Sequence, residues 1–190
     1  MNNFTFHNPT RILFGQGRIA DLAREIPASA RVLITYGGGS VVKTGTLAEV
    51  KAALPGYTLF EFGGIEPNPT YETLMQAVEL ARRENVDFLL AVGGGSVIDG
   101  TKFIAAAIPF AGEPWDILAK RAPVKSAIAF GSVLTLPATG SEMNNGAVIT
   151  LLAVTGLTHK VAYKDIFAIT MIKTSAVFAI IATYYLTGLV

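Results

Sequence analysis

The sequence predicts an α/β fold with a mostly parallel sheet, and three observations support this prediction. Short apolar runs alternate with segments whose apolar residues recur at helical spacing, which is the order that builds βαβ units. Two of these runs, residues 31–36 and 86–92, are almost continuously apolar, as strands buried on both faces of a sheet are. Each of the two runs leads into three consecutive glycines, so we expect glycine turns at the ends of strands.

The expected elements follow one another regularly. Apolar runs predict the strands, of which the first two form an edge hairpin, and apolar residues at helical spacing predict the helices. Two helix starts carry a side chain that can cap free backbone N–H groups: Thr46, with Glu49 at capping-box spacing, and Thr70. The expected strands are residues 4–6, 11–14, 31–36, 57–62, 86–92 and 127–136, and the expected helices are residues 19–26, 46–54, 71–85 and 97–108.

The glycines at 93–95 stand between the strand 86–92 and the helix that follows it. Because they have no side chains, a ligand can approach the backbone closely. Ser96 is predicted to cap the helix, with Asp99 at the spacing of a capping box. Free N–H groups and the positive end of the helix dipole favour an anion such as a phosphate. The alternative is a tight turn that binds nothing.

A second glycine turn, residues 37–40, follows the strand 31–36 in the same way. Ligands of parallel sheets bind at the carboxyl ends of strands, so one extended ligand such as a dinucleotide could touch both turns. A third strand end carries hydroxyl groups that could bond a ribose, a phosphate or a carboxamide, or form an ordinary turn: Thr135, Thr139 and Ser141. Neither glycine run matches G-x-G-x-x-G, because Ile98 occupies the last position. The residues by themselves predict a nucleotide-binding α/β domain.

Composition narrows the classes of function. The 190 residues suit one domain, or a domain with a tail, and the formal net charge of +1 without a basic cluster argues against a nucleic-acid surface. There is no cysteine, and the two histidines, His7 and His159, are far apart in sequence and form no His-x-x-x-His pair, so an internally complete metal site is not expected. The N-terminus shows no signal-peptide pattern, so a cytoplasmic location is expected.

Four segments carry a resemblance to a known family. They are residues 93–102 (GGGSVIDGTK), 135–144 (TLPATGSEMN), 8–15 (NPTRILFG) and 66–69 (EPNP). Over residues 1 to about 150 the chain resembles the iron-containing alcohol dehydrogenases, in particular the branch of NADP-dependent aldehyde reductases and butanol dehydrogenases. The resemblance implies an N-terminal Rossmann-like domain with helices on both faces of the sheet. In full-length members a helical metal-binding domain follows, which we expect to be absent here.

The resemblance also implies which residues contact the cofactor. NAD-preferring relatives carry an acidic residue near position 39, and since this turn has none, NADP is the expected cofactor. Asp99 is either a cofactor contact or, with Ser96, a helix cap. The expected cofactor-binding residues are Gly37, Gly38, Gly39, Ser40, Asn68, Gly94, Gly95, Ser96, Asp99, Thr135, Thr139 and Ser141.

The implied reaction is hydride transfer between NADP(H) and a small-molecule primary alcohol or aldehyde. Full-length relatives hold a divalent metal, iron or zinc, with one aspartate and three histidines, and this sequence has none of these in register. We therefore expect no metal ligand and no catalytic residue in this chain, which by itself would be inactive. The alternative is a non-catalytic NADP(H)-binding fragment.

Residues 151–190 depart from the family pattern and are strongly apolar. Residues 174–190 carry no charged side chain, a length at the lower limit for a membrane span. Their β-branched and aromatic residues fit buried strands as well. We expect a divergent tail that packs against the domain formed by residues 1–150, or against a second copy in a homodimer, in preference to a membrane segment.

Overall fold

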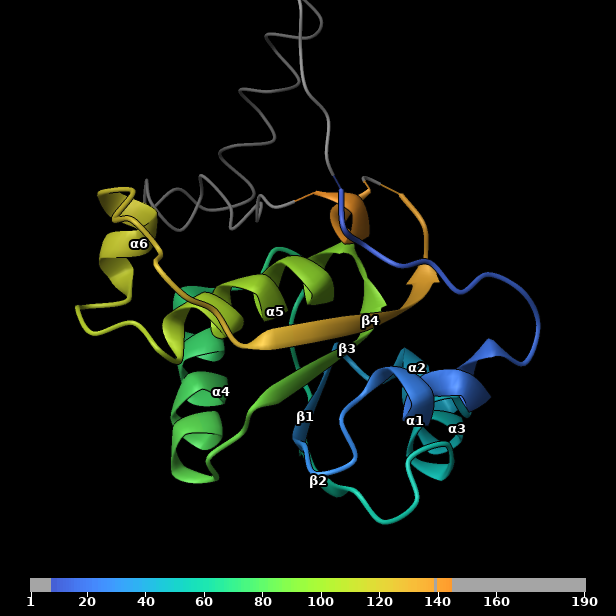
Figure 1. Cartoon of the computed structure of the whole chain (residues 1–190). Coiled ribbons are helices and arrows are strands. Elements are labelled where there is room, and N and C mark those ends of the chain that lie inside the picture. The colour runs from blue at the N-terminus through green and yellow to red at the C-terminus, as the bar shows by residue number, and fades with distance from the viewer. Residues whose placement is uncertain (1–7, 139, 145–190) are drawn as a thin grey trace, which may run out of the picture. The chain divides into compact units, whose positions relative to one another are not determined.

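The computed structural model describes residues 8–138 and 140–144 and contains a parallel sheet flanked by helices (Figure 1). The strands are β1 (Arg31–Tyr36), β2 (Thr58–Phe62), β3 (Phe88–Gly94) and β4 (Ala129–Leu136). The α-helices are α1 (Leu22–Glu25), α2 (Ser40–Lys43), α3 (Thr46–Ala52), α4 (Tyr71–Arg83), α5 (Gly95–Ala107) and α6 (Trp115–Ala119). Two short 3-10 helices are η1 (Arg18–Asp21) and η2 (Ser141–Met143).

The strand order is β2-β1-β3-β4, and each neighbouring pair is parallel. From β1 the chain passes to β2 on one side, then crosses back to β3 on the other side of β1 and continues outward to β4. The direction of winding therefore reverses between β1 and β3. Such a reversal is the topological switch point at which open α/β sheets bind ligands. The α/β fold with a mostly parallel sheet is confirmed.

Helices cover both faces of the sheet, as expected (Figure 1). Successive residues of a strand point to opposite faces. Leu33 belongs to the apolar cluster that includes α4 and α5, whereas Val32 and Ile34 belong to the cluster on the other face, which includes α3. All three side chains are 0% exposed. The continuous apolar run of β1 is thus explained by burial on two faces, each covered by a different group of helices.

The N-terminal segment differs from the prediction. The sequence predicts a strand over residues 11–14, but residues 8–17 form no strand, and the side chain of Phe14 is 92% exposed. A strand needs a neighbour for its backbone hydrogen bonds. No described strand pairs with residues 11–14, and their expected partner, residues 4–6, lies outside the described part of the chain.

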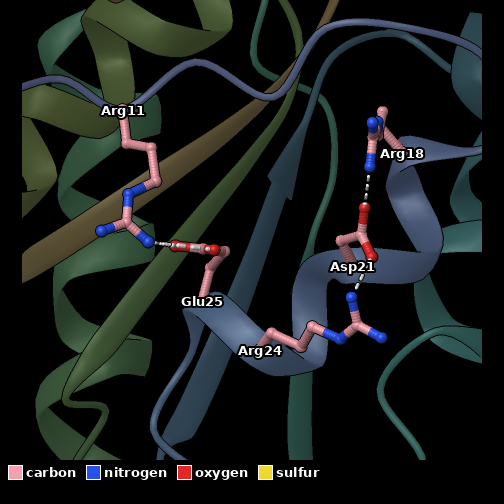
Figure 2. Close-up of polar contacts among 5 residues, drawn as sticks. All are labelled: Arg11, Arg18, Asp21, Arg24 and Glu25. Atoms are coloured by element: carbon pink, nitrogen blue, oxygen red, sulfur yellow. Dashed lines mark hydrogen bonds and ion pairs between the residues drawn. The ribbon is translucent and has the colours of Figure 1, made fainter.

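Ion pairs hold this segment and the first helices together (Figure 2). Arg11 Nη1 lies 3.0 Å from Glu25 Oε2 of α1. The two oxygens of the Asp21 carboxylate accept hydrogen bonds from Arg18 at 3.0 Å and Arg24 at 3.1 Å. The three arginines are largely exposed, so each pair stabilises the fold by no more than about 1 kcal/mol.

Three helix starts show which predicted caps form. Thr70 caps α4 as expected, its Oγ1 accepting from the backbone N–H of Thr73 at 3.4 Å. The capping boxes predicted at Thr46 and Ser96 are wrong, because neither α3 nor α5 has a side-chain cap. β3 continues through Gly94 and α5 begins at Gly95, two residues before the predicted start. Ser96 therefore lies inside the first turn of the helix and not ahead of it.

The predictions for residues 151–190, with the domain boundary at 150, lie outside the described residues. Among residues 8–138 and 140–144, none of the helices has the length and apolar character needed to cross a membrane.

Candidate functional site

The carboxyl ends of β1, β3 and β4 meet at one edge of the sheet. Tyr36, the last residue of β1, is paired with Val92 of β3, and Gly94 of β3 is paired with Leu136 of β4. The two glycine turns therefore follow neighbouring strands on either side of the switch point. The sequence predicts a ligand shared by both turns if their strands are neighbours or flank a switch point. The order of the strands in the sheet meets this condition.

The glycines of the first turn leave the backbone open to a ligand. A Cβ built on Gly38 or Gly39 would meet no atom within 4 Å. Gly39 has φ of +103°, a left-handed conformation that disfavours any side chain. Gly37 is different, because its Cβ would lie 3.1 Å from the carbonyl oxygen of Ile65. Packing explains Gly37, whereas open space at Gly38 and Gly39 is what a closely approaching ligand requires.

The loop between β2 and α4 joins the two glycine turns. Gly64 N–H donates to the carbonyl of Gly37 at 3.2 Å, which fastens the loop to the end of β1. At its other end, the backbone N–H of Asn68 donates to Ser96 Oγ of α5 at 3.4 Å. Asn68 has φ of 59°, in the left-handed region that asparagine tolerates better than most residues. Asn68 and Ser96, both predicted as cofactor contacts, are therefore direct neighbours.

Glu66 of the same loop was not predicted as a site residue. Its Oε1 accepts hydrogen bonds from the hydroxyl groups of Thr70 at 2.8 Å and Thr73 at 3.0 Å. Burial of the carboxylate raises its pKa, but hydrogen bonds from its own backbone N–H and from these two threonines outweigh burial, so that the pKa of Glu66 lies below its ordinary value. Glu66 is thus an ionised anchor that fixes the loop on the start of α4.

The end of β4 is irregular where hydroxyl groups were predicted. Gly93 is paired with Leu134 and Gly94 with Leu136, so the register shifts by one residue at Thr135. Thr135 is exposed at this shift, beside Gly94. Thr139 lies outside the described residues, and Ser141 is only 3% exposed in η2. Of these hydroxyl groups, that of Thr135 is open to a ligand, and that of Ser141 is enclosed by protein.

Asp99 is also enclosed. It lies in α5 with its side chain 8% exposed, and its Oδ1 is 3.3 Å from Nζ of Lys102, whose side chain is 9% exposed. Lys102 Nζ also donates to Oδ1 of Asn144 at 3.0 Å. Lys102 was not predicted as a site residue, although its position three residues after Asp99 is the spacing at which helical side chains meet.

The structure therefore brings most of the predicted residues to one edge of the sheet, from separate strand ends: Gly37, Gly38, Gly39, Ser40, Asn68, Gly94, Gly95, Ser96 and Thr135. Asp99 and Ser141 lie nearby but are buried. Among residues 8–138 and 140–144, no group of three or more histidine, aspartate or glutamate side chains is placed to hold a metal ion.

Comparisons with known proteins agree with this geometry. Residues 9–172 match the profile of a family described as iron-containing alcohol dehydrogenase. The chain is 66% identical over 152 residues to the NADPH-dependent aldehyde reductase YqhD of Escherichia coli, a match that covers 78% of this chain and 39% of that protein. It is 50% identical over 153 residues to the probable NADH-dependent butanol dehydrogenase 1 of Bacillus subtilis, covering 79% of this chain and 40% of that one.

A solved structure shows the same fold. The crystal structure of YqhD from E. coli K-12 superposes with a TM-score of 0.73 at 65% identity, over 75% of this chain and 37% of that chain. The chain thus spans about 40% of the length of these relatives. A shorter match is to a protein that is not named as a dehydrogenase or reductase. Over 63 residues the chain is 67% identical to an uncharacterised transporter, YxjC, of B. subtilis, covering 33% of this chain and 12% of the transporter.

Proposed function

This chain belongs to the iron-containing alcohol dehydrogenase family, and from that premise we propose that it binds NADP(H) at the edge of the sheet where β1, β3 and β4 end. The observation that carries the proposal is the meeting of two glycine turns at the switch point, one of them with an open, left-handed backbone at Gly39. Three strand ends and the loop 63–69 contribute to this edge, and a ligand that contacts all of them must be extended.

The residues at this edge fit the phosphates of a dinucleotide. α5 has 13 residues, and its first backbone N–H groups, at Gly95 and Ser96, have no side-chain cap to satisfy them. Such groups and the positive end of the helix dipole stabilise an anion. The Ser96 hydroxyl, which accepts from Asn68, can donate its own hydrogen to a phosphate oxygen. Gly38 and Gly39 leave room for the adenosine half.

We propose NADPH in preference to NADH, because residues 37–40 contain no carboxylate that would repel a 2′-phosphate. Calorimetric titration of the chain with both cofactors tests this preference. Both cofactors are relevant, because one relative is named as NADPH-dependent and another as NADH-dependent. A substitution at Gly39 would be strained by its φ of +103°, so Gly38 is the better position for a variant. Gly38→Asp should weaken NADPH about tenfold, or about 1.4 kcal/mol, more than it weakens NADH.

Gly38→Asn is the matched control, since it adds nearly the same volume without a charge. It should leave the ratio of the two affinities close to that of the unmodified chain. Equal affinity of the unmodified chain for NADPH and NADH, or the same response to Asp and Asn, would contradict the proposed preference.

For the reaction we propose hydride transfer between NADP(H) and a primary alcohol or aldehyde, as in a full-length enzyme of this family. This chain corresponds to the cofactor-binding part of such an enzyme. The bound nicotinamide supplies or accepts the hydride, and the residues named here hold its phosphates and ribose. The alternative is a binding domain without chemistry. An assay with butanal and NADPH, with zinc or iron added, separates the two: metal-dependent turnover by this chain would show that its catalytic parts are complete.

The remaining proposals concern the partners of the chain, its location in the cell and residues 151–190. We propose a small-molecule substrate, no nucleic-acid partner, a cytoplasmic location and a homodimer. For residues 151–190 we propose packing against the domain or a second copy. The alternative is a membrane segment, and partition of the full chain between buffer and lipid vesicles distinguishes it from packing against the domain.

A further inference from the structure

A buried charge pair lies next to the proposed cofactor site and is not explained by it. Asp99 and Lys102, on the same side of α5, have side chains 8% and 9% exposed, and Oδ1 and Nζ lie 3.3 Å apart. Enclosing two charges costs free energy that the pair recovers only with additional hydrogen bonds. An ammonium group has three donors, so Lys102 can serve further acceptors besides Asp99.

One of these acceptors is in a different part of the chain. Lys102 Nζ donates to Asn144 Oδ1 at 3.0 Å, 42 residues away in sequence. The amide of Asn144 in turn donates through Nδ2 to the carbonyl of Gly140 at 2.9 Å, and that same carbonyl accepts the backbone N–H of Met143 at 2.9 Å. Asn144 therefore closes the short turn 140–144 upon itself while it ties this turn to α5.

The turn has a second attachment, which joins it to the N-terminal segment. Asn8 Nδ2 donates to the carbonyl of Met143 at 2.8 Å, and Asn8 Oδ1 accepts from the backbone N–H of Thr10 at 2.9 Å. Figure 1 shows the N-terminal segment, in blue, passing beside η2, in agreement with this contact. Ser141, 3% exposed, is the buried residue of η2, so the turn depends on polar contacts more than on an apolar core of its own.

We propose that Lys102 is a positioning residue, which holds the turn 140–144 against α5 and so sets the β4 side of the cofactor site. This inference rests on the proposed binding of NADP(H). α5 begins at Gly95, directly at the end of β3, and Lys102 lies two turns further along the same helix. One rigid helix thus fixes both the phosphate-binding turn and, through Asn144, the segment that follows β4. Asp99 acts in the same unit by keeping the ammonium in place.

The variant Asn144→Ala tests the contact without disturbing the buried pair, because Asn144 is exposed and Asp99–Lys102 stays intact. The expected result is NADPH affinity about tenfold weaker by calorimetric titration, with an unchanged melting temperature. Without cofactor, the backbone amide of Met143 should exchange its hydrogen faster than in the unmodified chain. Asn144→Asp retains an oxygen for Lys102, and it should recover most of the lost affinity.

Removal of the ammonium tests Lys102 itself. Lys102→Met leaves Asp99 buried without its partner, so this variant is compared with the double variant Asp99→Asn/Lys102→Met, which removes both charges. The double variant should recover thermal stability but not NADPH affinity. Lys120→Met is the control, since Lys120 is an exposed lysine, 72% accessible, paired with Asp116 on α6, and it should change neither quantity.

The outcomes separate this inference from the proposed function. An unmodified chain that does not bind NADPH refutes both. If the unmodified chain binds and Asn144→Ala exchanges Met143 faster but keeps full affinity, the turn is anchored without positioning the cofactor, and the inference is wrong while the proposed function stands. Unchanged exchange of Met143, or full affinity in the double variant, also overturns it.

Discussion

At the scale of single residues, the two adjacent glycines at the end of β3 lack side chains for different reasons. A Cβ on Gly93 would lie 2.7 Å from Cγ2 of Val97, a buried and rigid neighbour. A Cβ on Gly94 would lie 3.6 Å from that of Leu136, an ordinary contact, and φ of −94° suits any residue. Gly93→Ala should therefore lower the free energy of unfolding by about 1–3 kcal/mol.

Gly94→Ala should leave stability nearly unchanged and weaken NADPH binding, because the added methyl group occupies space that a phosphate approaches. Urea unfolding and calorimetric titration of both variants give the comparison. A Gly94 variant that loses stability and keeps its affinity would mean that this glycine serves packing alone.

Tyr71 gives a residue-scale prediction about pH. Burial and a 2.6 Å hydrogen bond from its hydroxyl to Glu113 raise the pKa of Tyr71 to about 12. The folded state therefore keeps this proton at pH values where the unfolded chain, with an ordinary tyrosine pKa of 10.0, loses it. The stabilisation is complete below about pH 10 and is lost as the pH rises toward 12.

The phenolate absorbance of the folded chain should accordingly contain a late-titrating component, and Tyr71→Phe should remove that component. The variant should also lose less stability between pH 10 and 12 than the unmodified chain does. A titration in which every tyrosine ionises near its ordinary pKa would contradict this account.

At the scale of elements, a buried pair of hydroxyl groups joins β1 to α5. Thr35 and Thr101 are 0% exposed, and their Oγ1 atoms lie 2.6 Å apart. Thr101 donates to the carbonyl of Val97 at 2.7 Å, so the hydrogen between the two hydroxyl groups comes from Thr35. This direction predicts unequal effects. Thr101→Val leaves the Thr35 donor buried without an acceptor, whereas Thr35→Val leaves the bond from Thr101 to Val97 intact.

Thr101→Val should therefore cost about 1–3 kcal/mol of unfolding free energy, and Thr35→Val clearly less. Adding Thr35→Val to Thr101→Val should cost nothing further, because the double variant has no unpaired donor. Urea unfolding of the two single variants and the double variant completes the cycle. Strictly additive losses would show that the hydroxyl groups do not act as a pair.

At the scale of the whole molecule, the prediction concerns residues 166–190, in which Lys173 is the only charge. Burial of half of such a segment stabilises a fold by several kcal/mol at about 25 cal/mol per Å², and an exposed patch of that size would promote aggregation. Deletion of these residues should lower the melting temperature or cause aggregation, as seen by light scattering. A shortened chain that is monomeric, equally stable and more soluble would show that the tail does not contribute to the folded domain.

The sequence determined the order and type of the main elements. Periodicity predicted β1 to the residue, and it predicted the buried face of α4 at Leu74, Ala77, Val78 and Ala81, because local apolar patterns record which side of an element is buried. Glycines at 37–39 and 93–95 marked the strand ends, and the resemblance of four motifs indicated the family.

Tertiary structure decided the rest, because pairing between strands and contacts between distant segments leave no local pattern. Only the strand order placed the two glycine turns on either side of the switch point. Residues 11–14 have the composition of a strand but no described partner, so they form none. Ser96 has the spacing of a cap, yet β3 extends through Gly94 and Ser96 receives the Asn68 N–H instead. The contact of Lys102 with Asn144 spans 42 residues, and no sequence pattern at either end predicts it.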